Sequence, residues 1–224
     1  MEKNISYTIK SPQLFVQSLK HRSYLNATNA ERITSYERLE FLGDSILNMI
    51  VSENLYRQFP DKEEGELTKC KALLVNKKVL ASCAERINLG EFILLSEGEQ
   101  RSGGRNRPSI LSDVLESLIG AIYLDSGFHE AKIFIQRYVL TDMMQVLNDE
   151  MNTNFKGELL EFSQSSEWGM PHYVVISETG PEHNKQFTVE VKIKDLVYGT
   201  GKGMTKKDAE QQAAREALKK IKQN

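Results

Sequence analysis

Three carboxylates in the segment Glu-Arg-Leu-Glu-Phe-Leu-Gly-Asp-Ser, residues 37–45, have a spacing that suits metal binding. Glu37, Glu40 and Asp44 lie three and then four residues apart, so an α-helix would place all three on one face. The residues around them are mostly apolar, and like charges on such a helix repel each other, more so where they lose contact with water. A hard divalent cation would compensate this charge, which points to chemistry on phosphates.

A second acidic pair repeats this pattern further along the chain. Asp113 and Glu116 are three residues apart within the segment 110–124, the most apolar helix that we predict. Gly43 on the first helix and Gly120 on the second are small enough to let the two helices approach closely. Packed in this way, the two helices would bring four carboxylates within ligand distance of a shared ion.

Apolar residues at helical spacing predict that residues 1–147 are almost wholly helical. A helix begins after Ser11, and Glu64 lies in a predicted turn at 63–65, from which it could add another carboxylate to the site. We expect the principal helices at 36–59, 67–87, 110–124 and 130–147, with a polar loop at 26–34 and a basic, glycine-rich loop at 98–108.

Composition limits the classes of protein that this chain can belong to. It has 224 residues, of which 40% are hydrophobic and 27% charged, and no apolar run is long enough for a membrane span. The first residues lack the apolar core of a signal peptide, so we expect a cytoplasmic protein with no membrane partner.

Cys70 and Cys83 have no partners at metal-ligand spacing, so we predict that both are ordinary reduced thiols. With a net charge of −2, any binding to nucleic acid must come from local placement of charge.

The pattern changes at a short polar linker, residues 148–154. The last part of the chain, residues 155–224, begins with a predicted helix at 155–166 and ends with another that begins near Thr205. Between them lie three segments of alternating β-branched and aromatic residues, at 172–178, 186–193 and 196–201. The fold class is therefore multi-domain: an all-α domain followed by a small α+β domain of order α-β-β-β-α.

Three motifs in the helical part resemble those of bacterial ribonuclease III. They are His-Arg-Ser-Tyr at 21–24, the acidic segment at 37–45, and Ser-Asp-Val-Leu-Glu-Ser-Leu-Ile-Gly-Ala-Ile-Tyr-Leu-Asp-Ser-Gly at 112–127. The resemblance implies an endonuclease domain that cleaves double-stranded RNA with Mg²⁺, for which Mn²⁺ can substitute. The implied catalytic set has Glu40, Asp113 and Glu116 as metal ligands and Asp44 in a supporting role, with Glu37 and Glu64 as accessory acidic residues.

The implied reaction is hydrolysis in which water attacks phosphorus in line and the 3′ oxygen leaves, giving 5′-phosphate and 3′-hydroxyl ends. Processing of ribosomal RNA precursors, and of some messenger and transfer RNAs, is what the resemblance implies about substrates. The alternative is a regulator that binds double-stranded RNA without cutting it. The complete set of acidic residues argues against that alternative.

The last 70 residues resemble a double-stranded-RNA-binding domain, which reads the shape of A-form RNA through two minor grooves and the phosphates between them. Three regions match the RNA contacts of such domains. The residues implied by the match are Gln164 on the first helix, His183 and Lys185 between the first two strands, and Thr205, Lys206 and Lys207 at the start of the last helix. Leu160 is a departure, because a polar contact residue is common there. The alternative for the two lysines is that they are simply solvated charges.

A nuclease with one site per chain needs two chains to cut both strands, so the resemblance implies a homodimer. Phe41, on the side of the acidic helix away from Glu40, is the candidate interface residue, since a symmetric interface must be self-complementary. The alternative is that Phe41 belongs to the core of one subunit.

Glu37 also has an alternative role, as an ion-pair partner of Arg32 or Arg38. His21 suits a structural hydrogen bond better than catalysis.

Overall fold

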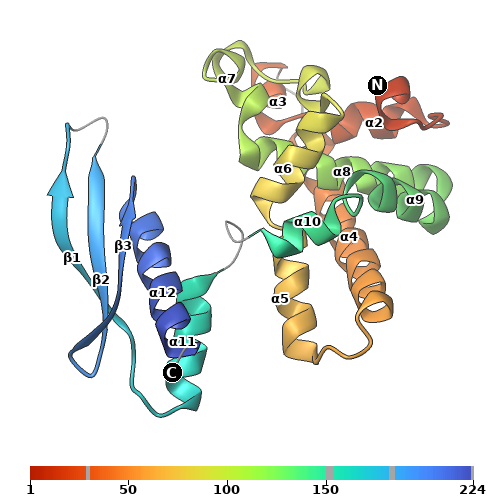
Figure 1. The fold of residues 1–224 in the computed structure, drawn as a ribbon. Coiled ribbons are helices and arrows are strands. Elements are labelled where there is room, and N and C mark those ends of the chain that lie inside the picture. The colour runs from red at the N-terminus through yellow and green to blue at the C-terminus, as the bar shows by residue number, and fades with distance from the viewer. Residues whose placement is uncertain (29–30, 150–153, 182–184, 223–224) are drawn as a thin grey trace. The chain divides into compact units, whose positions relative to one another are not determined.

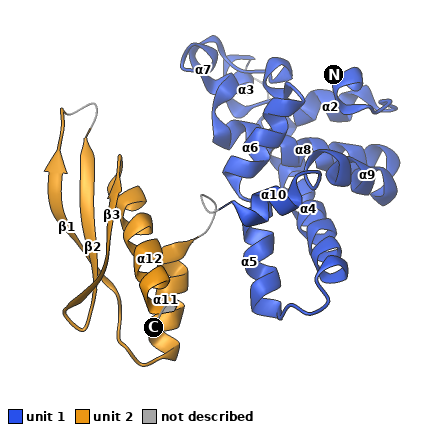
Figure 2. Ribbon diagram, in the orientation of Figure 1, with its two compact units in different colours: residues 1–152 blue, residues 153–224 orange. Residues whose placement is uncertain are grey.

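The chain folds into two compact units, Met1–Asn152 and Thr153–Asn224 (Figures 1 and 2). The structure is a computed structural model that describes residues 1–28, 31–149, 154–181 and 185–222. The first unit is helical and the second combines helices with a sheet, so the predicted multi-domain fold class is confirmed.

The first unit is built around one long helix, α8 (Pro108–Ser126), most of whose residues are buried. Packed on it are α4 (Glu37–Gln58), α6 (Lys77–Arg86), α2 (Pro12–Ser18) and α9 (Phe128–Tyr138) (Figure 1). The remaining elements are α1 (Glu2–Ile5), α3 (Arg22–Thr28), η1 (Arg32–Thr34), α5 (Glu64–Leu74), η2 (Leu89–Phe92), α7 (Glu97–Arg101), η3 (Gly104–Asn106) and α10 (Met143–Asn148).

Helices α4 and α8, which carry the two acidic groups, cross in backbone contact as predicted. A Cβ atom added to Gly43 would lie 1.7 Å from the backbone oxygen of Glu116. A Cβ atom added to Gly120 would lie 2.3 Å from the backbone oxygen of Leu39. Only glycine leaves room for this crossing, and it is what brings the carboxylates of the two helices to the same place.

The sequence pattern was wrong about several boundaries. The single helix predicted at 67–87 is two helices, α5 and α6, because the Asn76 side chain accepts the Val79 N–H and begins a new helix. The helix predicted at 130–147 is likewise divided into α9 and α10, and the loop predicted at 98–108 contains α7 and η3. Glu64 is the first residue of α5 and not part of a turn, because Glu63 forms a capping box with Glu66.

The second unit has the predicted order α11 (Phe155–Ser165), β1 (His172–Thr179), β2 (Gln186–Ile193), β3 (Leu196–Gly203) and α12 (Lys206–Lys222). The strands form an antiparallel sheet in the order β1-β2-β3, and a two-residue turn with positive φ at Lys194 and Asp195 joins β2 to β3. The face of α12 toward the sheet is rich in alanine. A Cβ atom on Gly201 would lie 2.2 Å from the Ala209 backbone oxygen, so α12 packs against the backbone of β3.

Within the described residues, no helix is both long and apolar enough to cross a membrane. Both cysteines are free thiols, Cys83 buried and Cys70 half-buried, as predicted.

Candidate active site

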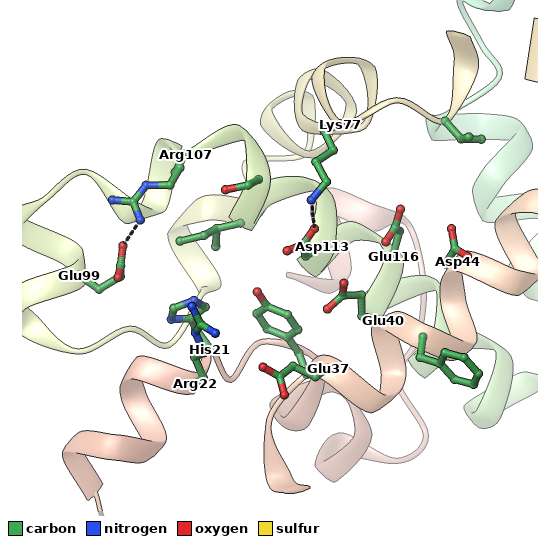
Figure 3. Close-up of a pocket in the computed structure, with 15 residues that line it drawn as sticks. His21, Arg22, Glu37, Glu40, Asp44, Lys77, Glu99, Arg107, Asp113 and Glu116 are labelled. Carbon is green, nitrogen blue, oxygen red and sulfur yellow. Dashed lines mark ion pairs between the residues drawn. The ribbon is translucent and has the colours of Figure 1, made fainter. Parts of the chain in front are cut away.

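Three carboxylates from the two crossing helices meet in one cluster. Glu40 comes from α4, and Asp113 and Glu116 come from α8 (Figure 3). Each offers a carboxylate oxygen, and these oxygens all lie within 4.8 Å of one another. All three side chains are half-buried at the wall of a pocket of about 810 Å³. We call these residues the carboxylate trio.

The carboxylate trio fits a hard divalent cation by both chemistry and spacing. Mg²⁺ takes oxygen ligands at about 2.1 Å, so ligands on opposite sides of the ion are about 4.2 Å apart. The 4.8 Å limit of the trio is only slightly wider than this separation. Glu40, Asp113 and Glu116 are therefore the residues that could hold such an ion, with the open pocket supplying the remaining positions.

Burial, together with the crowding of negative charge, raises the pKa of two of these carboxyl groups and makes them hard to ionise without a cation. Burial, followed by the charges of Asp113 and Glu37, raises the pKa of Glu40 to about 7. Burial, followed by the charges of Asp44 and Asp113, raises the pKa of Glu116 to about 8. A bound divalent cation would reverse this effect by favouring the charged forms.

The other predicted acidic residues lie at different positions. Asp44 is exposed on the pocket wall, and its Oδ1 accepts a hydrogen bond of 2.8 Å from Asn48, so three carboxylates cluster where four were expected. Glu37 also lines the pocket but pairs with Arg32 at 3.1 Å, the alternative role foreseen for it. Glu64 accepts a hydrogen bond from Thr68 and does not line this pocket.

Lys77 is a site residue that the sequence did not reveal. It begins α6, and its Nζ lies 3.5 Å from Asp113 Oδ1 (Figure 3). Its charge lowers the pKa of both Glu40 and Glu116, against the larger upward effects. Nothing local in the sequence marks it, because the spacing from Lys77 to Asp113 is too long for any helical or strand pattern.

The far end of the pocket carries charges of both signs. Arg22 and Arg107 line it, the latter paired with Glu99 at 2.5 Å (Figure 3). His21 is buried there, and its Nδ1 accepts the Ser23 N–H, which agrees with a structural role. Burial lowers the pKa of His21, so this histidine is neutral at pH 7.

The predicted RNA-contact residues that the structure describes are exposed or half-exposed on the second unit. Gln164 is exposed on α11, and Leu160 on the same helix is half-buried. Lys185 is half-exposed and pairs with Glu178 at 2.7 Å, and His183 lies outside the described residues.

The start of α12 has the geometry that suits a phosphate. The hydroxyl of Thr205 accepts the Asp208 N–H at 3.1 Å, which caps the helix as expected. Lys206 and Lys207 are exposed beside this cap, and Lys206 Nζ lies 5.6 Å from the centre of the Phe187 ring. Positive side chains at the positive end of a helix dipole favour an anionic ligand.

Phe41 is an exposed apolar residue beside the acidic pocket. Its relative exposure is 78%, so the alternative that it belongs to the core is wrong. Next to it lies a hollow of about 570 Å³, lined by leucines that include Leu14, Leu42 and Leu124 and also by the polar side chains of Gln17, Glu37 and Arg38. The exposed Phe41 ring is apolar, and so are the leucines in the lining of the hollow beside it.

Comparison with known proteins assigns each unit to a family. A family model described as ribonuclease-III-like matches residues 11–143, and the double-stranded RNA binding motif matches residues 155–221. Together these two matches cover most of the chain.

Similar proteins match over nearly the whole length. The chain is 42% identical over 221 residues to Ribonuclease 3 of Caldanaerobacter subterraneus, covering 99% of this chain and 96% of that protein. It is 40% identical to Ribonuclease 3 of Halalkalibacterium halodurans, covering 96% and 82%. Among solved structures, the nuclease domain of ribonuclease III from Campylobacter jejuni matches with 43% identity and a TM-score of 0.58. That match covers 62% of this chain and 92% of the other.

Proposed function

The chain belongs to the ribonuclease III family of endoribonucleases, and from that premise we propose that it cleaves double-stranded RNA with Mg²⁺ held by Glu40, Asp113 and Glu116. The observation that carries this proposal is the carboxylate trio, three half-buried oxygen donors within 4.8 Å of one another in a pocket open to a large ligand. Mn²⁺, which prefers similar oxygen ligands, would substitute.

The proposed reaction breaks the bond between phosphorus and the 3′ oxygen. The oxygen of a water attacks phosphorus in line, the 3′ oxygen leaves and takes up a proton, and the products carry 5′-phosphate and 3′-hydroxyl ends. When bound, the divalent ion would supply a water of lowered pKa and stabilise charge on the transferred phosphate.

Asp44 would assist by orienting the attacking water. Its Oδ1 is engaged by Asn48, which leaves Oδ2 to accept a hydrogen bond from that water. Glu37 would act indirectly, because its charge raises the pKa of Glu40 and it is already paired with Arg32. Glu64 remains an accessory residue whose contribution we propose only from the motif that it matches.

The second unit would hold the duplex. We propose that Gln164 and His183 contact the minor grooves, and that Lys206 and Lys207, with Lys185 and Thr205 near them, contact the intervening phosphates. Exposure of Gln164, Lys206 and Lys207 supports this assignment. The half-buried Leu160 would leave α11 with fewer polar contacts to RNA than other such domains make.

The working form would be a homodimer, since one site cuts one strand. The matching nuclease domain from Campylobacter jejuni is described as flexible in a region involved in dimer formation. The exposed Phe41 and the hollow beside it, partly lined by leucines, support a self-complementary contact. We propose that Phe41 of each chain enters the hollow of the other. Maturation of ribosomal, messenger and transfer RNA precursors in the cytoplasm would be the setting.

Incubation of the purified protein with a long RNA duplex tests the function directly. With Mg²⁺ we expect cleavage to short duplexes whose 5′ phosphates can be removed by a phosphatase, and with EDTA we expect none. An intact duplex in both reactions would favour the non-cleaving regulator instead.

The variant Glu116→Gln separates catalysis from binding. It should lose at least about a thousandfold in cleavage rate while binding the duplex as wild type does, because the RNA-binding unit is untouched. Loss of binding in parallel would show that Glu116 has a structural role.

A further inference from the structure

The ammonium group of Lys77 lies next to the proposed metal ligands but is only loosely held there. Its Nζ is 3.5 Å from Asp113 Oδ1, a long separation for an ion pair, and its side chain is 71% exposed. Exposed pairs of this kind contribute little to stability. By contrast, the backbone at Lys77 is well fixed, because Asn76 caps α6 at the preceding position. The backbone of Lys77 is therefore held in place, while its ammonium group can move to another partner.

The position of the Lys77 ammonium group beside the trio would also allow it to contact a ligand in the pocket. In Figure 3, Lys77 extends from α6 toward Asp113, while Glu40 extends from α4 on the other side of the pocket. A ligand that reaches the trio from the open side of the pocket therefore meets the carboxylates and, next to Asp113, the ammonium group of Lys77. The long flexible stem of lysine allows its charge to follow such a ligand.

The charges around the trio favour movement of the Lys77 ammonium group from Asp113 to an RNA phosphate. Three ionised carboxylates exceed the charge of one divalent ion, so a cation at Asp113 is useful before RNA arrives. Once the ion and an RNA phosphate are both present, the ion repels the ammonium and the phosphate attracts it. The phosphate is then the stronger partner, because charge-assisted bonds to phosphate oxygens strengthen as water is excluded.

We propose that Lys77 is a positioning residue, which leaves Asp113 when RNA binds and holds a phosphate oxygen of the strand being cut, at or beside the scissile linkage. This inference rests on the proposed function, because it assumes that RNA enters the pocket of the trio. It assigns α6, which carries no predicted metal ligand, a direct contact with substrate.

The experiment compares Lys77→Met with wild type, with Lys77→Arg as the conservative variant and Lys78→Met as the matched control. Lys78 is the next residue on the same helix, exposed and outside this pocket. Two quantities are measured: Mg²⁺ affinity without RNA by titration calorimetry, and the single-turnover cleavage rate at saturating Mg²⁺. The substrates are short duplexes with one cut position, in which an uncharged methylphosphonate replaces single phosphates at or beside the cut.

We expect Lys77→Met to bind Mg²⁺ at least as tightly as wild type and to cleave about tenfold more slowly, with Lys77→Arg recovering part of the rate. At one linkage, the methylphosphonate should slow wild type and Lys78→Met but have little further effect on Lys77→Met, because the contact is already lost. Equal methylphosphonate effects in all variants, an unchanged rate, or weaker Mg²⁺ binding by Lys77→Met would overturn the proposal. Failure of wild type to cleave would instead refute the proposed function.

Discussion

At the scale of single residues, the candidate site is a set of carboxyl groups in which binding of protons and binding of the proposed metal ion would be coupled. The pKa of Glu40 is raised to about 7 and that of Glu116 to about 8, mainly by burial and then by neighbouring negative charges. A metal ligand must be deprotonated, so protons and the metal compete for the same oxygens.

Metal affinity should therefore rise with pH across the neutral range. We expect Mg²⁺ to bind more weakly at pH 6 than at pH 8, with release of protons on binding, because Glu40 and Glu116 are largely protonated at pH 6 without metal. Calorimetry in two buffers of different ionisation enthalpy measures the number of protons released. Glu116→Gln is the control and should release fewer protons. An affinity that is flat between pH 6 and pH 8 would contradict this prediction.

The same raised pKa values affect stability with the opposite sign. Between about pH 4.5 and pH 8, Glu40 and Glu116 hold more protons in the folded metal-free protein than in the unfolded chain, so these two groups make the free energy of unfolding fall as pH rises. Added Mg²⁺ should therefore raise the melting temperature more at pH 8 than at pH 6.

At the scale of elements, the crossing of α4 and α8 determines which carboxylates meet. Gly43 and Gly120 let the two backbones touch, and Glu40 and Glu116 lie within one helical turn of these contacts. The carboxylate trio is thus a consequence of helix packing.

Gly43→Ala should disrupt both packing and catalysis. The new Cβ atom would lie 1.7 Å from the Glu116 backbone oxygen, so the helices must separate, at a cost of about 1–3 kcal/mol in unfolding free energy. Chemical denaturation and Mg²⁺ titration measure the two effects. Gly65→Ala in α5 is the matched control, since its Cβ would meet nothing within 4 Å, and it should leave both quantities near their wild-type values. A Gly43→Ala protein with normal stability and metal affinity would argue against this account.

The start of α12 is the second element to which we assign a role, the proposed contact with RNA phosphates. Replacing Lys206 and Lys207 by alanine should weaken duplex binding and reduce the slope of log affinity against log salt by up to about two, one for each phosphate contact. The matched control is Lys219 and Lys220 to alanine, which removes the same charge at the other end of the helix. Binding measured at several salt concentrations distinguishes them, and equal slopes in both double variants would exclude a specific phosphate contact.

At the scale of the whole molecule, the proposed function assigns cleavage to one unit and RNA binding to the other, and it would require two chains to cut both strands. The helical unit carries the carboxylate trio, and the α+β unit carries the helix start that suits RNA phosphates. The exposed Phe41 lies on the same helix as Glu40, so α4 would serve both catalysis and association.

Phe41→Asp should separate the dimer and convert double-strand cutting into slow nicking, because a carboxylate would lose its water against the leucines that line the hollow of a partner. Sedimentation velocity gives the mass, and native and denaturing gels of the products separate nicks from complete cuts. Met170→Asp, at an exposed apolar residue of the other unit, is the control and should remain dimeric. If wild type is a monomer at working concentration, or if Phe41→Asp is still a dimer, this interface is wrong.

The sequence by itself determined those features that depend on neighbours along the chain. Helical spacing identified both acidic helices, alternation identified the three strands, and small residues at Gly43 and Gly120 predicted their close approach. These features can be predicted because the spacing of side chains along one face of a helix or strand depends only on residues near each other in the sequence. The ends of helices were predicted less accurately, because they depend on a few side-chain hydrogen bonds such as those of the caps Asn76 and Glu63.

Only the tertiary structure decided which charges meet. It selected three carboxylates and left Asp44 outside the cluster, paired Glu37 with Arg32, and brought Lys77 to Asp113. The physical reason is that the rotation of one helix against another is set by the packing of all their neighbours. A separation of 36 residues along the chain therefore carries no information about a distance of 3.5 Å in space.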